Sequence, residues 1–116
     1  MMGRKVLVCG GRDFDDRARL YGVLDEMHRD MPIGCIISGN ARGADTLGEQ
    51  WAKQNRVALM QFPANWDVMG NAAGKIRNTW MLDFGKPDCV VATDGGPGTR
   101  HMVTQARRAG VEVFKV

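Results

Sequence analysis

The chain has 116 residues, a length that favours a single domain spanning residues 1–116. Hydrophobic residues make up 44% of it and charged residues 25%, with a formal charge of +3, which argues against a disordered, collagen-like or coiled-coil protein. No apolar run approaches the roughly 20 residues that cross a bilayer, and the N-terminus lacks the pattern of a secretory signal. We therefore expect a cytoplasmic protein without membrane contact.

Five short segments have the composition of β-strands. Continuous apolar runs at residues 6–9, 35–37 and 89–92 are typical of strands buried on both faces of a parallel sheet. Residues 57–62 and 111–116 mix polar side chains into the apolar pattern, as outer strands with partly solvated faces do. The sequence therefore predicts three central strands and two outer strands.

Segments with helical spacing of apolar residues alternate with these strands. Each of four segments repeats apolar side chains every three or four residues, which predicts a helix packed on the sheet. The predicted core-facing side chains are Leu20, Val23, Leu24 and Met27; Ala44, Leu47 and Trp51; Ile76, Trp80 and Phe84; and Met102, Val103, Ala106 and Ala109.

Alternation of five strands with four helices predicts an α/β fold, a three-layer, doubly wound parallel sheet in the order 3-2-1-4-5. Ligands of such sheets bind beyond the carboxyl ends of the strands, at the switch point between strands 1 and 4. The loops at that edge are residues 10–13, 38–45, 63–74 and 93–99. They hold nine of the 15 glycines, about twice the number expected from their length, which indicates close backbone approach or a ligand.

These loops favour an anionic ligand. Backbone N–H groups of glycine-rich loops can approach phosphate, and helices predicted to begin at Ala44 and Thr99 add their positive ends. Arg12, Arg42 and Arg77 lie on or just after the same loops, where guanidinium groups suit phosphate. We expect Arg77, at the start of the third helix, to contact ligand with little role in stability. Alternatively, the glycines only form tight turns and the arginines pair with neighbouring aspartates.

Standard cofactor and metal motifs are missing from the sequence. Residues 10–14 lack the spacing of a dinucleotide fingerprint, and residues 70–75 are one residue short of a phosphate-binding P-loop. Neither His28 nor His101 has a histidine or cysteine at metal-ligand spacing, and the three isolated cysteines have the pattern of reduced core residues. We therefore predict no metal site and no cofactor.

Four segments in order resemble a known group of proteins. They are GGRDF at residues 10–14, SGNARGAD at 38–45, AGKIRN at 73–78 and GGPGT at 95–99. Together they resemble the SLOG superfamily, and more narrowly its small YspA-like, YpsA-related branch, over essentially the whole chain. The resemblance implies a Rossmann-like domain that binds nucleotides or nucleotide-derived ligands such as ADP-ribose.

One related group, the LOG phosphoribohydrolases, implies a hydrolase of N-glycosidic bonds in nucleotides. In their motif Pro-Gly-Gly-x-Gly-Thr-x-Glu, Asp94 here replaces the proline and His101 the glutamate, so these two would be the catalytic candidates. Loss of the carboxylate weakens stabilisation of the positive charge that develops during hydrolysis. The matching residues are Gly95, Gly96, Gly98, Thr99 and, on the preceding helix, Arg77.

A second related protein, the recombination mediator DprA, implies binding of single-stranded nucleic acid. The even distribution of charge along the chain disfavours that function, because such proteins combine basic grooves with aromatic side chains. The residues that match its Ser-Gly-x-Ala-x-Gly-x-Asp stretch are Ser38, Gly39, Ala41, Gly43 and Asp45.

The leading hypothesis is a protein that binds a nucleotide-derived small molecule as a sensor, carrier or sequestering protein. Whether the ligand is turned over stays open, and the resemblance also allows a homo-oligomer. Trp66 is included as an aromatic surface for a base. The candidate ligand-binding residues are Gly10, Gly11, Arg12, Asp13, Ser38, Gly39, Asn40, Arg42, Gly43, Asp45, Trp66, Arg77, Asn78, Asp94, Gly95, Gly96, Gly98 and Thr99.

Overall fold

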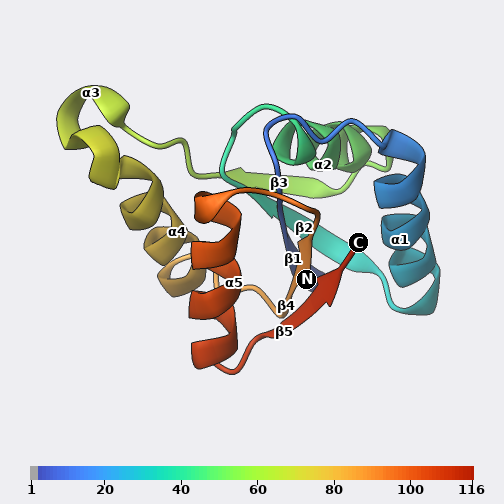
Figure 1. Ribbon diagram of the computed structural model, residues 1–116. Coiled ribbons are helices and arrows are strands. Elements are labelled where there is room, and N and C mark those ends of the chain that lie inside the picture. The colour runs from blue at the N-terminus through green and yellow to red at the C-terminus, as the bar shows by residue number, and fades with distance from the viewer. Residues whose placement is uncertain (1–2) are drawn as a thin grey trace.

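The computed structural model describes residues 3–116 and contains a five-stranded, all-parallel sheet between two layers of helices (Figure 1). The strand order is β3-β2-β1-β4-β5, which confirms the predicted three-layer, doubly wound, Rossmann-like α/β fold. The strands are β1 (Arg4–Cys9), β2 (Ile33–Ser38), β3 (Ala58–Gln61), β4 (Cys89–Ala92) and β5 (Glu112–Lys115).

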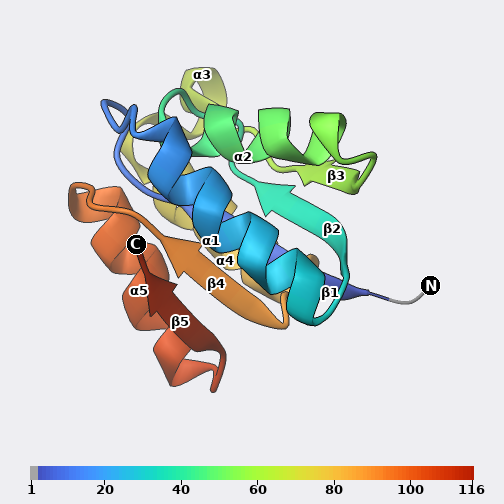
Figure 2. The same ribbon diagram turned by 90° about the vertical axis from the view of Figure 1, so that its right-hand side faces the viewer.

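Two pairs of helices cover the two faces of the sheet. Helices α1 (Arg17–Asp30) and α2 (Ala44–Gln54) pack on one face, and α4 (Ala73–Asp83) and α5 (Pro97–Arg108) pack on the other. Figure 2 shows α1 in front of the sheet and α4 behind it. Within residues 3–116, no helix combines the length and apolar composition needed to cross a membrane.

Burial on both faces explains the continuous apolar runs in the central strands. Val6 and Val8 of β1 join the core under α1 and α2, whereas Leu7 and Cys9 join the core under α4 and α5. Successive side chains of a strand point to opposite faces, so both faces of β1 need apolar residues. Cys9 and Cys89 are buried free thiols, as predicted, and Cys35 is a half-buried free thiol.

The connection after β3 is more ordered than the sequence indicates. Residues 63–74 are predicted as a long loop, but they contain the one-turn helix α3 (Trp66–Met69) and the 3-10 turn η1 (Gly70–Ala72). The side chain of Asn65 accepts a hydrogen bond from the backbone N–H of Val68 at 3.3 Å and so caps α3. A short capped helix of this kind has too few residues to produce a periodic apolar pattern.

The predicted core face of α4 is wrong. Trp80 is 39% exposed and Phe84 is 69% exposed, while Met81 is buried against the sheet. The buried side of the helix also holds Ala73 and Asn78, so it mixes a small and a polar residue with an apolar one. The spacing of apolar residues therefore identifies the wrong face of α4, because the side of the helix that is buried also contributes a polar residue to a cavity at the carboxyl edge of the sheet. Helix α5 also begins earlier than predicted, at Pro97 rather than Thr99.

The backbone of Gly43, which caps the N-terminus of α2, generates a prediction about stability. Its φ of 76° and ψ of −127° are accessible only to glycine, and a Cβ atom there would collide with the carbonyl oxygens of Gly11 and Arg12. Gly43→Ala should lower the free energy of unfolding by about 2 kcal/mol or more, measured by urea denaturation.

Gly22→Ala is the matched control for this measurement. Gly22 lies inside α1, and a Cβ atom there has no heavy atom within 4 Å. Alanine favours helix over glycine by roughly 1 kcal/mol, so this variant should be as stable as the wild type or more stable. Similar losses of stability in both variants would contradict the structural role assigned to Gly43.

Candidate functional site

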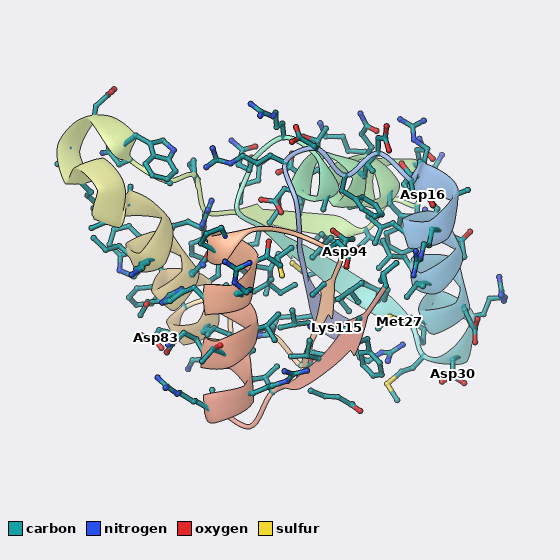
Figure 3. The ribbon with its side chains drawn as sticks, viewed as in Figure 1. Asp16, Met27, Asp30, Asp83, Asp94 and Lys115 are labelled. Carbon is teal, nitrogen blue, oxygen red and sulfur yellow. The ribbon has the colours of Figure 1, made fainter. Side chains whose placement is uncertain are left out.

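A cavity of about 850 Å³ lies at the carboxyl edge of the sheet, between the loops that follow β1 and β4. This is the switch point of the doubly wound fold. Asp94, labelled in Figure 3, lies two residues after the end of β4 at this edge. The sequence-predicted residues that line the cavity are Gly10, Gly11, Arg12, Asp13, Arg42, Asp45, Trp66, Arg77, Asn78, Asp94, Gly95, Gly96, Gly98, Thr99 and His101.

Four predicted residues do not line the cavity: Ser38, the last residue of β2, and three residues of the loop that follows it. Ser38 is fully buried, and its hydroxyl donates a hydrogen bond to Oε2 of Glu49 at 2.7 Å and accepts one from the N–H of Asn40 at 3.0 Å. Gly39, Asn40 and Gly43 lie in the loop after β2 but outside the cavity lining. The buried partner Glu49 lies on α2, and its position gave no signal in the sequence.

Cationic side chains surround the cavity. Arg12, Arg42, Lys75 and Arg77 line it, and Lys75 is a site residue that the sequence reasoning missed although it lies in the AGKIRN segment. Three carboxylates also line the cavity, so four cations minus three anions leaves an excess of one positive charge. Arg42 lies 3.6 Å from Asp13, but both side chains are exposed, and such a pair contributes little stability.

Trp66 gives the cavity an aromatic surface. The side chain is 48% exposed, and the guanidinium carbon of Arg12 lies 5.5 Å from the centroid of its ring, a cation–π distance. This contact joins the loop after β1 to the first residue of α3, and both residues line the cavity. The arrangement leaves one large aromatic ring accessible beside several cations.

The glycines of this edge fall into two groups. Gly11 belongs to the first, because its N–H donates to the carbonyl of Asp94 at 2.7 Å and a Cβ atom would lie 2.7 Å from that oxygen. Glycines of this group allow two loops to approach each other closely. This agrees with the alternative interpretation of the sequence, in which the glycines have only a structural role. Gly96 and Gly98 belong to the second group, because they line the cavity at the start of α5 with open space around them. Packing does not require glycine at these two positions.

Arg77 connects three parts of the site. Its Nη1 donates a hydrogen bond to the carbonyl of Gly39 at 2.6 Å, and its Nε donates one to Oδ1 of Asn78 at 3.0 Å. Asn78 in turn places its Nδ2 at 3.1 Å from both the carbonyl of Gly98 and Nδ1 of His101.

Burial lowers the pKa of Arg77, and the nearby carboxylate of Asp45 opposes that shift. The hydrogen bonds to Gly39 and Asn78 give Arg77 a structural role beside the ligand contact expected from the sequence, and Arg77 lies in the second turn of α4 rather than at its start.

Asp45 is a buried carboxylate in the wall of the cavity. Only 7% of the residue is exposed, and Oδ2 accepts a hydrogen bond from the N–H of Ala41 at 3.1 Å. Burial raises the pKa of Asp45 to about 6, with a smaller contribution from Glu49, while the Ala41 N–H and the nearby arginines act in the opposite direction. A carboxylate with such a pKa in a cavity is typical of functional sites.

Burial of Asp45 predicts a pH-dependent stability. A pKa raised from 3.8 to about 6 corresponds to a cost of about 3 kcal/mol when the carboxylate is ionised. The folded protein binds this proton more tightly than the unfolded chain, so the cost is absent below about pH 4 and complete above about pH 6. Asp45→Asn should therefore be more stable than the wild type at neutral pH, and the difference should disappear toward about pH 4.

Urea denaturation across this pH range measures the effect. Asp83→Asn is the control, because Asp83 is an exposed carboxylate at the far end of α4 from the cavity (Figure 3). The control should follow the wild type within about 0.5 kcal/mol. If the difference in the free energy of unfolding between the wild type and Asp45→Asn does not change with pH, ionisation of Asp45 does not destabilise the folded protein.

Comparison with known proteins agrees with the motifs at this edge of the sheet. Residues 4–68 match the model of the YspA, cpYpsA-related SLOG family. Over 96% of its length the chain is similar to the Gene 61 protein of Mycobacterium phage D29, with 36% identity and 94% of that protein covered. No solved structure shows a significant match. The chain belongs to the YspA, cpYpsA-related SLOG family, the branch that its four motifs predict.

Proposed function

We propose that the protein binds a phosphate-bearing nucleotide or nucleotide derivative, such as ADP-ribose, in the cavity at the carboxyl edge of the sheet, and that it acts as a sensor, carrier or sequestering protein. The convergence of four cationic side chains on a cavity of about 850 Å³ supports this function most strongly. That volume lies within the usual range for small-molecule sites. Membership of a SLOG family is consistent with a nucleotide-related ligand.

The phosphate, the base and the ribose of such a ligand each have complementary groups among the residues that line the cavity. The N-terminus of α5, with Gly96 and Gly98 open to the cavity, offers backbone N–H groups and a positive helix end to phosphate. The exposed ring of Trp66 offers a surface on which a base can stack. The carboxylates of Asp45 and Asp94 can accept hydrogen bonds from ribose hydroxyls. A nucleotide thus matches the cavity better than a simple phosphate ion does.

Hydrolysis of an N-glycosidic bond is the second candidate function, and Asp45 is the observation that favours it. A carboxylate with a pKa of about 6 can donate or accept a proton near neutral pH. Against this function, His101 stands where LOG enzymes carry a carboxylate, and its Nδ1 is already in contact with Asn78. An imidazole supplies no fixed negative charge to an oxocarbenium-like transition state.

Binding of ADP-ribose is tested by calorimetry on the wild type and two arginine variants. Arg12→Ala should weaken binding by about tenfold or more, because it removes an exposed cation of the cavity lining and its contact with Trp66. Arg107→Ala is the control, since Arg107 is an exposed residue at the other end of α5. Equal affinities of the two variants would place the ligand elsewhere or show that Arg12 does not contact it.

Turnover is tested by incubating AMP and ADP-ribose with the protein and measuring released base by chromatography. The proposed function predicts that both compounds are recovered intact after long incubation. Release of base at about 1 per second or faster is typical of an enzyme, and loss of that release in Asp45→Asn would establish a hydrolase instead.

A further inference from the structure

The contacts of Asn78 determine the orientation of its side-chain amide. Its Oδ1 accepts the hydrogen bond from Nε of Arg77 at 3.0 Å, so its Nδ2 must face the opposite way. There Nδ2 lies 3.1 Å from the carbonyl oxygen of Gly98 and 3.1 Å from Nδ1 of His101. An amide NH₂ group has two protons and only donates, so one proton goes to each of these atoms.

We propose that Asn78 is a positioning residue that holds His101 neutral, with its proton on Nε2, so that His101 presents a hydrogen-bond donor to the cavity. Since Nδ1 accepts the Asn78 proton, a neutral ring must carry its own proton on Nε2. The inference that this donor contacts a ligand rests on the proposed function, whereas the inference about the protonation of the ring does not.

The surroundings of His101 oppose a second proton on its ring. Protonation of Nδ1 would set two donors against each other, and Asn78 cannot turn without losing its bonds to Arg77 and Gly98. Lys75 and Arg77 on α4 line the same cavity and Arg100 precedes His101 on α5, whereas the carboxylates in the cavity lining are those of Asp13, Asp45 and Asp94. Burial and the charge of Lys75 both lower the pKa of His101. His101 is therefore neutral at physiological pH.

This protonation state limits what His101 can do for a ligand. One ring nitrogen is occupied by Asn78 and the other carries a proton, so His101 has no free lone pair with which to act as a general base. It can donate a hydrogen bond to an acceptor, such as a phosphate oxygen or an unprotonated ring nitrogen of a base. His101 is therefore a binding residue specific for acceptor atoms rather than the catalytic candidate that the sequence predicts.

Long-range ¹H–¹⁵N NMR correlation of the histidine rings tests the inference without ligand. The chain has two histidines, and His28 is an internal reference because its Nδ1 accepts a hydrogen bond from the backbone N–H of Ile33 at 2.9 Å. Both rings should show a protonated Nε2 and an unprotonated Nδ1 at neutral pH. A protonated Nδ1 on His101 of the wild type, or a rapidly exchanging mixture of both forms, would overturn the inference.

The substitution Asn78→Asp tests whether Asn78 determines which nitrogen of His101 carries a proton. The carboxylate can keep the bond to Arg77 but offers His101 an acceptor instead of a donor, so the ring should gain a proton on Nδ1 while the His28 signals stay unchanged. If the variant is folded and the His101 signals match those of the wild type, Asn78 does not position the ring. If the variant does not fold, the wild-type spectrum alone decides whether Nε2 carries the proton.

Ligand titration separates this inference from the proposed function. His101→Gln keeps a side-chain donor and should bind ADP-ribose within about threefold of the wild type, whereas His101→Glu removes it and should bind at least about tenfold more weakly. Equal binding by both variants would overturn the donor role. Failure of the wild type to bind ADP-ribose would count against the proposed function, while the NMR measurement would still decide the protonation state of His101.

Discussion

The guanidinium group of Arg77 on α4 joins elements that form the cavity, because it donates to the carbonyl of Gly39 in the loop after β2 and to Oδ1 of the neighbouring Asn78, which in turn contacts α5. By fixing the amide of Asn78, it determines which atoms meet Gly98 and His101 at the start of α5. It also places positive charge near Asp45, whose ionised carboxylate is otherwise costly to bury. The geometry and the electrostatics of the site thus depend on one cation that a sequence pattern would assign to the ligand alone.

The cavity contains groups that oppose stability, whereas the middle of the central strand below it is entirely apolar. Asp45 is an almost fully buried carboxylate, and Trp66 is nearly half exposed to solvent. In contrast, Val6, Leu7 and Val8 of the central strand are completely buried among apolar side chains. Proteins commonly retain unfavourable groups where binding or chemistry requires them, and a rigid apolar core supplies the stability that offsets their cost. This distribution is the reason to look for function at the carboxyl edge of the sheet.

The sequence predicts the strands well because central strands of a parallel sheet need apolar side chains on both faces, and the handedness of the crossovers then leaves few possible strand orders. It predicts the buried face of α4 badly because Ile76, Trp80 and Phe84 repeat at helical spacing, while the inward side carries Asn78 for hydrogen bonding. The roles of Ser38 and Arg77 also depend on partners distant in the chain, Glu49 and Gly39, which no local pattern connects. The residues of the rim could thus be predicted, but their hydrogen-bond partners could not.

The binding of a nucleotide-derived ligand at this edge of the sheet is tested most directly by titrating ¹⁵N-labelled protein with ADP-ribose and following the backbone amide signals. The account predicts that the amides of Gly11, Gly96 and Gly98, which line the cavity, shift with a common affinity. The amides of Gly22, inside α1, and Gly110, just after the C-terminal end of α5, should stay unchanged. Shifts confined to Gly22 or Gly110, or no shifts at all at saturating ADP-ribose, would contradict it.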